Sequence, residues 1–283
     1  MTSLTIHTDS GSNPALAIDG LAADTDRRFG GLSRLYGPNG PARSQSARMA
    51  VVGLGGVGSW TAEALARCGV GHLTLIDLDH IAESNVNRQL HALSDTLGQA
   101  KVEAMADRVR GINPECDVRV IDDFVTPDNA AELLPADLDV IVDCTDQAAA
   151  KIAMILLARQ RKQGFVLCGG AGGKTDPLAL RGGDLSLATH DALLAKLRNV
   201  LRKQHGFARP AAKAGKPGRI PKMGVRALWF DQQAILPREW QEQGAPSGAA
   251  PQGLSCAGYG SVVMVTAAMG MAAANEAVRQ VLG

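Results

Sequence analysis

The sequence predicts an α/β fold with a mostly parallel sheet and helices on both faces. Short apolar runs rich in β-branched residues alternate with amphipathic stretches between residues 49 and 168, as in parallel sheets that helices cover on both sides. The first run, Ala50-Val51-Val52, leads straight into a glycine cluster. Asp77 stands 19 residues after Gly58, at the end of the second run. Together these features predict a Rossmann-like sheet, followed by an irregular basic C-terminal extension.

The expected elements alternate in chain order. We predict strands over residues 49–53, 72–76, 117–122, 138–143 and 164–168, and helices over 57–68, 98–112, 127–134 and 147–162. The helix over 98–112 has the clearest signal, because Val102, Met105 and Val109 recur at three- and four-residue intervals and form one apolar stripe. Later elements are a glycine-rich turn over 169–173, a helix over 188–204 and a strand over 225–230.

The last apolar run covers residues 261–274 and is dense in Val, Met and Ala. Its 14 residues fall short of the ~20 that a helix needs to cross hydrocarbon. We therefore expect a buried helix or a helix at a homodimer interface, and no membrane span.

The domain organisation is expected to be simple. Residues 1–26 contain no Lys or Arg and are rich in small and polar residues, so we expect a disordered tail without the basic start and apolar core of a secretory signal. Residues 27–283 are expected to form a single domain with a flexible basic insert at about 196–226. The five cysteines are scattered and include no C-x-x-C pair, which indicates reduced thiols, a cytoplasmic location and no structural zinc.

The glycine cluster and the residues after Asp77 predict a triphosphate site. Glycine lets a phosphate approach the backbone closely, and the helix that follows points its free N–H groups at that phosphate. Asp77 can bind a ribose hydroxyl. The cations Arg88 and Lys101 can neutralise phosphates, whereas Asp79 can bind magnesium. The predicted nucleotide-binding residues are Gly53, Gly55, Gly56, Gly58, Ser59, Asp77, Asp79, Asn85, Arg88 and Lys101.

Each of these residues also has an ordinary structural interpretation. The glycines alone are compatible with a plain tight turn, Asn85 with a residue that shapes a turn, and Arg88 with a solvated charge. A nicotinamide dinucleotide would need the glycines but not the Asn-Arg-Gln cluster, so the combination favours ATP.

Asp143 ends the strand predicted over 138–143, and Asp146 follows three residues later, at the edge where parallel sheets bind their ligands. We expect Asp146 to bind magnesium or to orient the nucleotide. The alternative role is an N-cap for the next helix.

Several separate motifs, agreeing in order and spacing, resemble the ATP-dependent adenylylating enzymes related to ubiquitin-activating, molybdopterin-synthase-activating and thiamine-biosynthesis proteins. Within this family the chain is most similar to the bacterial enzymes that dehydrate threonylcarbamoyladenosine in tRNA. The matching segments are Arg28-Phe29-Gly30-Gly31 with Arg34-Leu35-Tyr36-Gly37, Gly53 to Ser59, Asp77 to Gln89, Lys101, Asn113 to Cys116, Asp122 to Asn129, Asp143-Cys144-Thr145-Asp146 and Gly169 to Gly173.

The resemblance implies ATP and Mg²⁺ as cofactors, a homodimer, and activation of a carboxylate by transfer of AMP. It implies that the carboxylate belongs to threonylcarbamoyladenosine in tRNA, which then cyclises with loss of water. Arg88, Lys101 and Asp146 would be the catalytic residues, and sulfur-transfer proteins are candidate partners. Two alternatives stay open: adenylylation of a ubiquitin-like sulfur carrier protein, and a nucleotide-sensing RNA-binding module without turnover.

The basic charges are concentrated in one stretch. Ten Lys and Arg and no acid lie between Lys196 and Arg226, which leaves 19 basic against 28 acidic residues elsewhere. Such a run is often a solvated face, but it also attracts a phosphate backbone. The predicted tRNA-binding residues are Lys196, Arg202, Lys203, Arg209, Lys213, Lys216, Arg219 and Lys222.

Two further features are candidates only. Cys256 precedes the last apolar run and is a candidate nucleophile, although a small buried hydrophobic residue is the commoner role of cysteine. The turn Gly169 to Gly173, with Asp176, is a candidate site for a monovalent cation, although a strained turn is the simpler interpretation.

Overall fold

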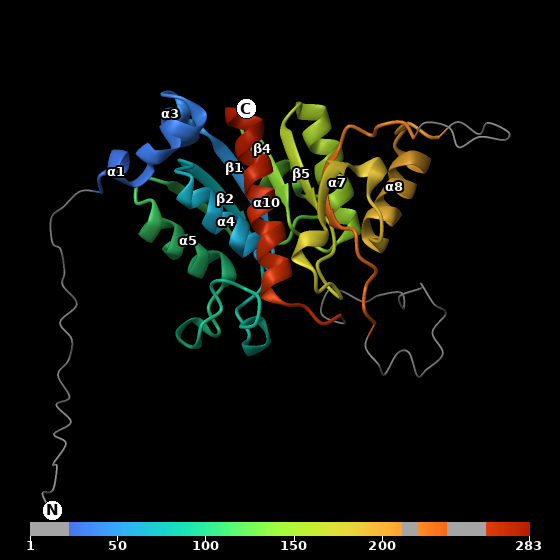
Figure 1. Cartoon of the computed structure of the whole chain (residues 1–283), viewed down its shortest axis with the longest axis horizontal. Coiled ribbons are helices and arrows are strands. Elements are labelled where there is room, and N and C mark those ends of the chain that lie inside the picture. Colours follow the sequence, from blue (N-terminus) through green and yellow to red (C-terminus); the bar gives the residue numbers. More distant parts are fainter. Residues whose placement is uncertain (1–22, 211–219, 237–258) are drawn as a thin grey trace, which may run out of the picture.

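The computed structural model describes residues 23–210, 220–236 and 259–283 and contains one seven-stranded sheet (Figure 1). The strands lie in the order β3-β2-β1-β4-β5-β7-β6. All neighbours pair in parallel except β6 and β7, which are antiparallel. The strand bounds are β1 (Arg48–Val52), β2 (His72–Ile76), β3 (Asp117–Ile121), β4 (Val140–Asp143), β5 (Gly164–Cys168), β6 (Leu180–Asp184) and β7 (Arg226–Phe230).

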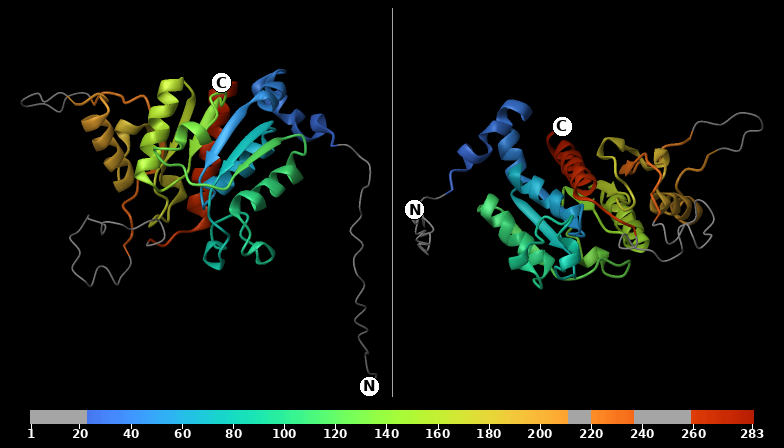
Figure 2. Two further views of the ribbon diagram at one scale, coloured as in Figure 1. Left: turned by 180° about the vertical axis from the view of Figure 1, so that it is seen from behind. Right: turned by 60° about the horizontal axis from the view of Figure 1, so that its bottom comes forward.

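Helices cover both faces of this sheet. On one face, α4 (Gly58–Arg67), α5 (Lys101–Ile112) and α10 (Val263–Leu282) pack on the side chains of alternate strand residues such as Met49 and Val51. On the other, α6 (Ala130–Leu133), α7 (Ala148–Arg161) and α8 (Ala192–Gln204) cover the intervening residues. Accordingly, α10 lies in front of the sheet in Figure 1 and behind it in the left view of Figure 2.

Several shorter elements are also present. Within residues 23–210, 220–236 and 259–283, three helices precede β1 and five 3-10 turns lie in the connections. The bounds are α1 (Thr25–Phe29), α2 (Ser33–Tyr36) and α3 (Gly40–Ser46), with 3-10 turns at Gly30–Leu32, Glu83–Asn85, Ser94–Thr96, Pro177–Ala179 and Leu185–Leu187.

The predicted strands and helices between residues 49 and 168 are all present, and the predicted α/β fold is confirmed. Several elements differ from expectation. The helix predicted over 127–134 has only one regular turn, α6; the helix predicted from 188 begins at Ala192; and β6 was not predicted. Strand β6 contains Gly182 and Gly183, which have little strand propensity, and it forms because its backbone pairs with β7.

Helix α10 fixes the position of α4. It is longer than the apolar run predicted, because Ala277, Val278 and Leu282 continue its buried stripe beyond residue 274. At Gly270 the two helices cross so closely that a Cβ atom would lie 2.5 Å from the carbonyl oxygen of Val57. Glycine is therefore required there, and α10 supports the N-terminal end of α4.

Some predictions fall outside the described residues: Cys256, most of the predicted tail over 1–26, and residues 211–219 of the predicted basic insert. The start of that insert, from Lys196, belongs to α8. Among the described residues, no helix combines the length and apolarity needed to cross a bilayer, and this includes the 20-residue α10.

Candidate functional site

One cavity of about 700 Å³ opens at the carboxyl ends of β1, β2 and β4. This is the point at which the strand order reverses, because the chain leaves β1 toward β2 on one side and later returns as β4 on the other. Open parallel sheets bind ligands at such reversal points. The predicted residues that line the cavity are Gly53, Gly55, Gly56, Asp77, Asp79, Asn85, Arg88, Lys101 and Asp146.

The glycine loop forms the floor of this cavity. Gly53 has a φ of +85°, and a Cβ there would lie 3.1 Å from the backbone of Cys144. Gly58 and Ser59, which we predicted as nucleotide-binding residues, do not line the cavity. A Cβ at Gly58 would lie 1.8 Å from the oxygen of Gly53, and the buried Ser59 hydroxyl donates to the oxygen of Gly55 and accepts from the N–H of Leu90. These two residues fix the shape of the loop.

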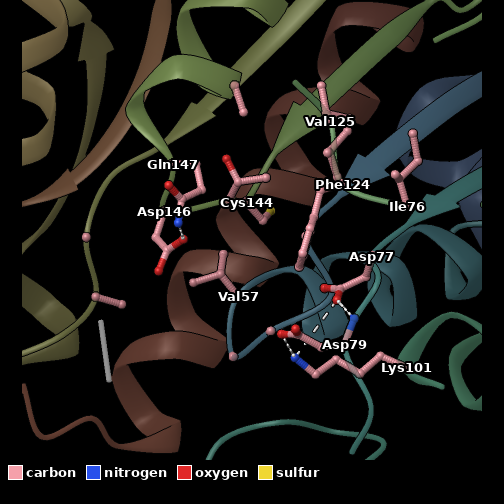
Figure 3. Close-up of a pocket in the computed structure, with 18 of the residues that line it drawn as sticks. Val57, Ile76, Asp77, Asp79, Lys101, Phe124, Val125, Cys144, Asp146 and Gln147 are labelled. Carbon is pink, nitrogen blue, oxygen red and sulfur yellow. Dashed lines mark hydrogen bonds and ion pairs between the residues drawn. The ribbon is translucent and has the colours of Figure 1, made fainter. Parts of the chain in front are cut away.

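Asp77, Asp79 and Lys101 form one end of the cavity (Figure 3). The Lys101 ammonium lies 2.7 Å from the Asp79 carboxylate and 4.0 Å from that of Asp77. The buried Asp77 carboxylate also accepts the N–H groups of Leu54 and Asp79, at 2.5 and 2.9 Å. Burial raises the pKa of Asp77, and the Lys101 charge and these N–H groups oppose the rise. The pairing therefore keeps a buried cation beside the cavity.

Arg88 lies over the glycine loop. Its Cγ atom is 3.2 Å from where a Cβ of Gly56 would be. Its guanidinium donates to the backbone carbonyl oxygen of Ser84 at 2.7 Å and to the side-chain oxygen of Asn87 at 3.0 Å. The backbone carbonyl of Arg88 accepts from the indole N–H of Trp60. Asn85 is buried, and its side-chain oxygen accepts the N–H of Ala82. Asn85 thus shapes the turn that carries Arg88.

In Figure 3, Asp146 and its neighbour Gln147 lie on the opposite side of the cavity view from Lys101, and Phe124 lies between Asp146 and Lys101. It is exposed, and its carboxylate accepts from the Gln147 amide at 3.3 Å. The described residues contain no group of three or more His, Cys, Asp or Glu side chains that could bind a metal. Because Mg²⁺ commonly uses one or two carboxylates together with substrate phosphates, the exposed Asp146 fits such a role, whereas Asp79 is engaged by Lys101.

A second lysine lies beneath the cavity. The Lys151 ammonium is 3.1 Å from the Asp143 carboxylate and donates to the backbone carbonyl oxygen of Cys168 at 2.8 Å. Neither the Lys151 nor the Asp143 side chain is exposed. Asp143 also accepts from the N–H and hydroxyl groups of Thr145. Burial raises the pKa of Asp143, and the Lys151 charge opposes the rise. The pair joins α7 to the ends of β4 and β5.

The wall beyond Asp146 was not predicted to contact the nucleotide, although its glycine-rich turn was a candidate site for a monovalent cation. It consists of residues 169–172 and Leu193. Asp191 caps α8 by accepting the N–H of Leu194 and also accepts the N–H of Gly170, both at 2.8 Å. An aspartate directly before an apolar helix is a recognisable N-cap signal. Phe124, an aromatic residue that is 50% exposed at the cavity, lies in a segment that we matched to a family motif without assigning it a role.

The described basic residues that we predicted for tRNA binding lie on α8 and after it. None of them lines the cavity that contains Lys101. Lys196, Lys203 and Lys222 are exposed, whereas Arg202 is half-buried. Arg209 donates to the oxygens of Arg202 and Lys203 and so closes the end of α8. Three further predicted residues lie outside the described part of the chain, namely Lys213, Lys216 and Arg219.

Comparison with known proteins gives consistent results. Residues 29–283 match the family described as the ThiF family. The tRNA threonylcarbamoyladenosine dehydratase of Haemophilus influenzae is 42% identical over 258 residues, which cover 91% of this chain and 94% of that protein. The crystal structure of the Escherichia coli tRNA N6-threonylcarbamoyladenosine dehydratase in complex with ATP matches with a TM-score of 0.77 and 40% identity, covering 93% of this chain and 97% of that chain. The molybdopterin-synthase adenylyltransferase of Escherichia coli is 36% identical over 113 residues, which cover 40% of this chain and 45% of that protein.

Proposed function

The chain belongs to the ThiF family, and we propose that it is an ATP-dependent tRNA threonylcarbamoyladenosine dehydratase. It uses ATP to activate the threonyl carboxylate of N6-threonylcarbamoyladenosine in tRNA, which then cyclises with net loss of water. One observation carries this proposal: a single cavity joins the glycine loop to Arg88, Lys101 and Asp146, in a chain that matches such a dehydratase over 91% of its length.

The chemistry requires ATP because a carboxylate is a poor electrophile until one of its oxygens becomes part of a leaving group. A carboxylate oxygen attacks the α-phosphorus of ATP, and the bond to pyrophosphate breaks. A nucleophile within the same threonylcarbamoyl group then closes a ring on the acyl carbon. AMP leaves with the former carboxylate oxygen and the nucleophile loses a proton. The nucleoside thus loses the elements of water, while ATP becomes AMP and pyrophosphate.

Lys101 and Arg88 stabilise the negative charge that develops on the phosphates. Lys101 is suited to this because its ammonium lies beside the cavity and its nearest partner, Asp79, is 56% exposed at the side chain. A phosphate oxygen can therefore join or replace Asp79 as its partner. Arg88 crosses the glycine loop, where the backbone N–H groups at the start of α4 favour phosphate.

Asp146 is the carboxylate that we assign to Mg²⁺, which is bound together with the phosphates. Its exposure at the cavity supports this assignment. The metal, when bound, supplies positive charge that offsets the charge of the triphosphate. Asp79 remains a weaker candidate, because Lys101 already neutralises it.

The tRNA acceptor is assigned to the side of the cavity that leads to α8. Asp191 connects the start of this helix to Gly170 in the cavity wall, and the exposed Lys196 and Lys203 lie further along the same helix. A tRNA whose phosphates contact these lysines would therefore lie along α8, the helix whose N-cap residue is hydrogen-bonded to the cavity wall. Phosphate contacts of this type position a nucleic acid without reading its sequence.

We also propose a homodimer. Met264 and Met271 are 58% and 43% exposed on α10, and Leu35 on α2 is 77% exposed. Exposed large apolar side chains on an apolar helix favour burial against a second copy. The sulfur-transfer partners and the monovalent cation stay predictions.

Pyrophosphate release with different acceptors tests the function. The purified chain is incubated with ATP and Mg²⁺ and with one of three additions: tRNA that carries N6-threonylcarbamoyladenosine, the same tRNA without the modification, or a ubiquitin-like sulfur carrier. We expect release with the modified tRNA only. Release with the carrier alone would support carrier activation instead, and no release with any acceptor would support a nucleotide-sensing module.

Calorimetric titration tests the nucleotide independently of turnover. We expect ATP to bind and NAD to bind much more weakly, because the cations Arg88 and Lys101 match a triphosphate. Tighter binding of NAD would contradict the assignment of the cavity.

A further inference from the structure

Two cysteine thiols lie side by side under the cavity. Cys144 is the first residue after β4, and Cys168 is the last residue of β5. Because Asp143 pairs with Leu167 in the parallel register, the next positions, 144 and 168, are neighbours across the two strands. Their Sγ atoms are 3.9 Å apart. The other described cysteines, Cys68 and Cys116, are also free thiols.

The backbone spacing at this position suits a disulfide. Neighbouring strands lie about 4.8 Å apart in a sheet, and disulfides join residues whose Cα atoms are about 4.4 to 6.8 Å apart. The sulfur atoms would have to approach each other by roughly 2 Å to reach bonding distance. Rotation of the two side chains can supply much of this movement, because both already point to the same side of the sheet.

The two thiols differ in access. Cys144 is half-buried and lines the cavity, whereas Cys168 is 1% exposed and does not line it. Burial therefore keeps an oxidant away from the Cys168 thiol. An oxidant that enters the cavity therefore meets Cys144 first.

We propose that Cys144 and Cys168 form an oxidisable dithiol that a hydroperoxide converts into a disulfide. The Cys144 sulfur attacks the peroxide, the O–O bond breaks, and the products are a sulfenic acid and, for hydrogen peroxide, water. The Cys168 sulfur then attacks the Cys144 sulfur, the S–O bond breaks, and the oxygen leaves as a second water with the Cys168 proton. The two thiols are oxidised by two electrons and the peroxide is reduced.

The disulfide would act on the cavity through the glycine loop. The backbone of Cys144 packs against Gly53. The Cβ atom of Cys144 lies 3.2 Å from the position that a Cβ atom on Gly58 would occupy. Movement of Cys144 toward Cys168 would shift this contact and the Asp146 segment that follows. On the premise of the proposed function, oxidation weakens ATP binding, and bound ATP slows oxidation because it covers Cys144.

Peptide mapping tests the dithiol directly. Trypsin cleaves after Lys and Arg, so Cys144 and Cys168 fall in the separate peptides 120–151 and 163–174. After treatment of the reduced full-length chain with a few equivalents of hydrogen peroxide, we expect these peptides to be linked and a reducing agent to separate them. The link should be absent from Cys144→Ser and Cys168→Ser and unchanged in the control Cys116→Ser.

In Cys168→Ser, the sulfenic acid should persist on Cys144 and react with a cyclic 1,3-diketone. The proposal would be overturned if Cys144 is oxidised without forming the link, or if either peptide joins a different cysteine. The ATP effect is measured on protein whose ATP binding has been shown by calorimetry. If ATP binds and the link still forms at the same rate, the coupling to the cavity is wrong. If ATP does not bind, the proposed function fails while the dithiol can still form its link.

Discussion

Two lysine–aspartate pairs lie at the carboxyl edge of the sheet, and they differ in what surrounds them. Lys101 pairs with Asp79, whose side chain is 56% exposed, and it lines the cavity. Lys151 pairs with Asp143, and neither side chain is exposed. Lys151 also donates to the oxygen of Cys168, so every contact it makes in the structure is internal.

The difference separates a chemical role from a structural one. A cation whose partner is exposed can exchange that partner for a substrate phosphate, whereas a fully buried ion pair cannot reach a substrate without unfolding. The same two residue types therefore serve different purposes. On the proposed function, Lys101 is available to the phosphates of ATP. Lys151 joins the ends of β4 and β5, next to Asp146 and residues 169–172 of the cavity wall.

The largest effect is expected on stability, from Lys151→Met. Removing one partner of a buried ion pair leaves an uncompensated charge and typically costs about 3–5 kcal/mol. Urea denaturation should show a loss of this size. The double variant Asp143→Asn/Lys151→Met should recover much of it, because no buried charge remains. As a matched control, Lys196→Met replaces an exposed lysine and should change the free energy of unfolding by less than about 0.5 kcal/mol. A similarly small change for Lys151→Met would contradict the structural role.

The next effect is expected on turnover, from Lys101→Ala and Arg88→Ala. Loss of one charge contact to the transition state typically costs about 3 kcal/mol, or roughly a hundredfold in rate. Both variants should remain folded and be destabilised less than Lys151→Met, which near-native circular dichroism and urea curves would verify. Arg110→Ala removes a surface cation paired with Asp107 and should keep normal turnover. Near-normal rates in either cavity variant would refute its assigned role.

A smaller effect is expected on tRNA affinity from charges outside the cavity. The triple variant Lys196→Glu/Lys203→Glu/Lys222→Glu should bind tRNA about tenfold more weakly and reduce the log–log salt slope by roughly 2 to 3, at about 0.7 to 0.9 per lost contact. The control triple Arg27→Glu/Arg110→Glu/Arg119→Glu has the same net charge as the test triple. Its three residues are also exposed, but they lie on α1, α5 and β3. Anisotropy across a salt series should separate the two, and calorimetry should find unchanged ATP affinity in both. Equal slopes for the two triples would remove the tRNA role of α8.

An effect no larger than this should distinguish the two carboxylates proposed for Mg²⁺. Asp146→Asn should increase the Mg²⁺ concentration needed for half-maximal turnover by about tenfold, because it removes a charged ligand. Asp79→Asn should change it by less than about fivefold, since an exposed ion pair contributes at most about 1 kcal/mol. The reverse order would reassign the metal to Asp79.

Local sequence patterns were sufficient for the central strands and the glycine loop. Their signals, apolar runs and glycines at fixed spacing, depend on neighbouring residues. Strand β6 could not be predicted, because its backbone is ordered by pairing with β7 and two of its residues are glycines. The C-terminal half of α10 was missed because Glu276 and Arg279 interrupt the apolar run, although Ala277 and Leu282 remain buried.

Within the site, the sequence indicated which residues belong to the nucleotide-binding motifs. It did not indicate which of their side chains are buried and so turned away from the cavity. The sequence indicated that Ser59 contacts the nucleotide, yet its hydroxyl faces Gly55 and Leu90 behind the loop. Nothing near Lys151 in the sequence shows that the backbone carbonyl of Cys168, 17 residues away, accepts a hydrogen bond from its ammonium group. Such differences arise from contacts between distant elements, which no local pattern records.

The most direct test is the mass of the modified nucleoside itself. The chain is incubated with ATP, Mg²⁺ and tRNA carrying N6-threonylcarbamoyladenosine; the tRNA is then digested to nucleosides under mild conditions and analysed by mass spectrometry. We predict that the nucleoside loses one water, that AMP forms in equal amount, and that Lys101→Ala forms both products roughly a hundredfold more slowly. An unchanged nucleoside in the presence of folded, ATP-binding protein would contradict the account.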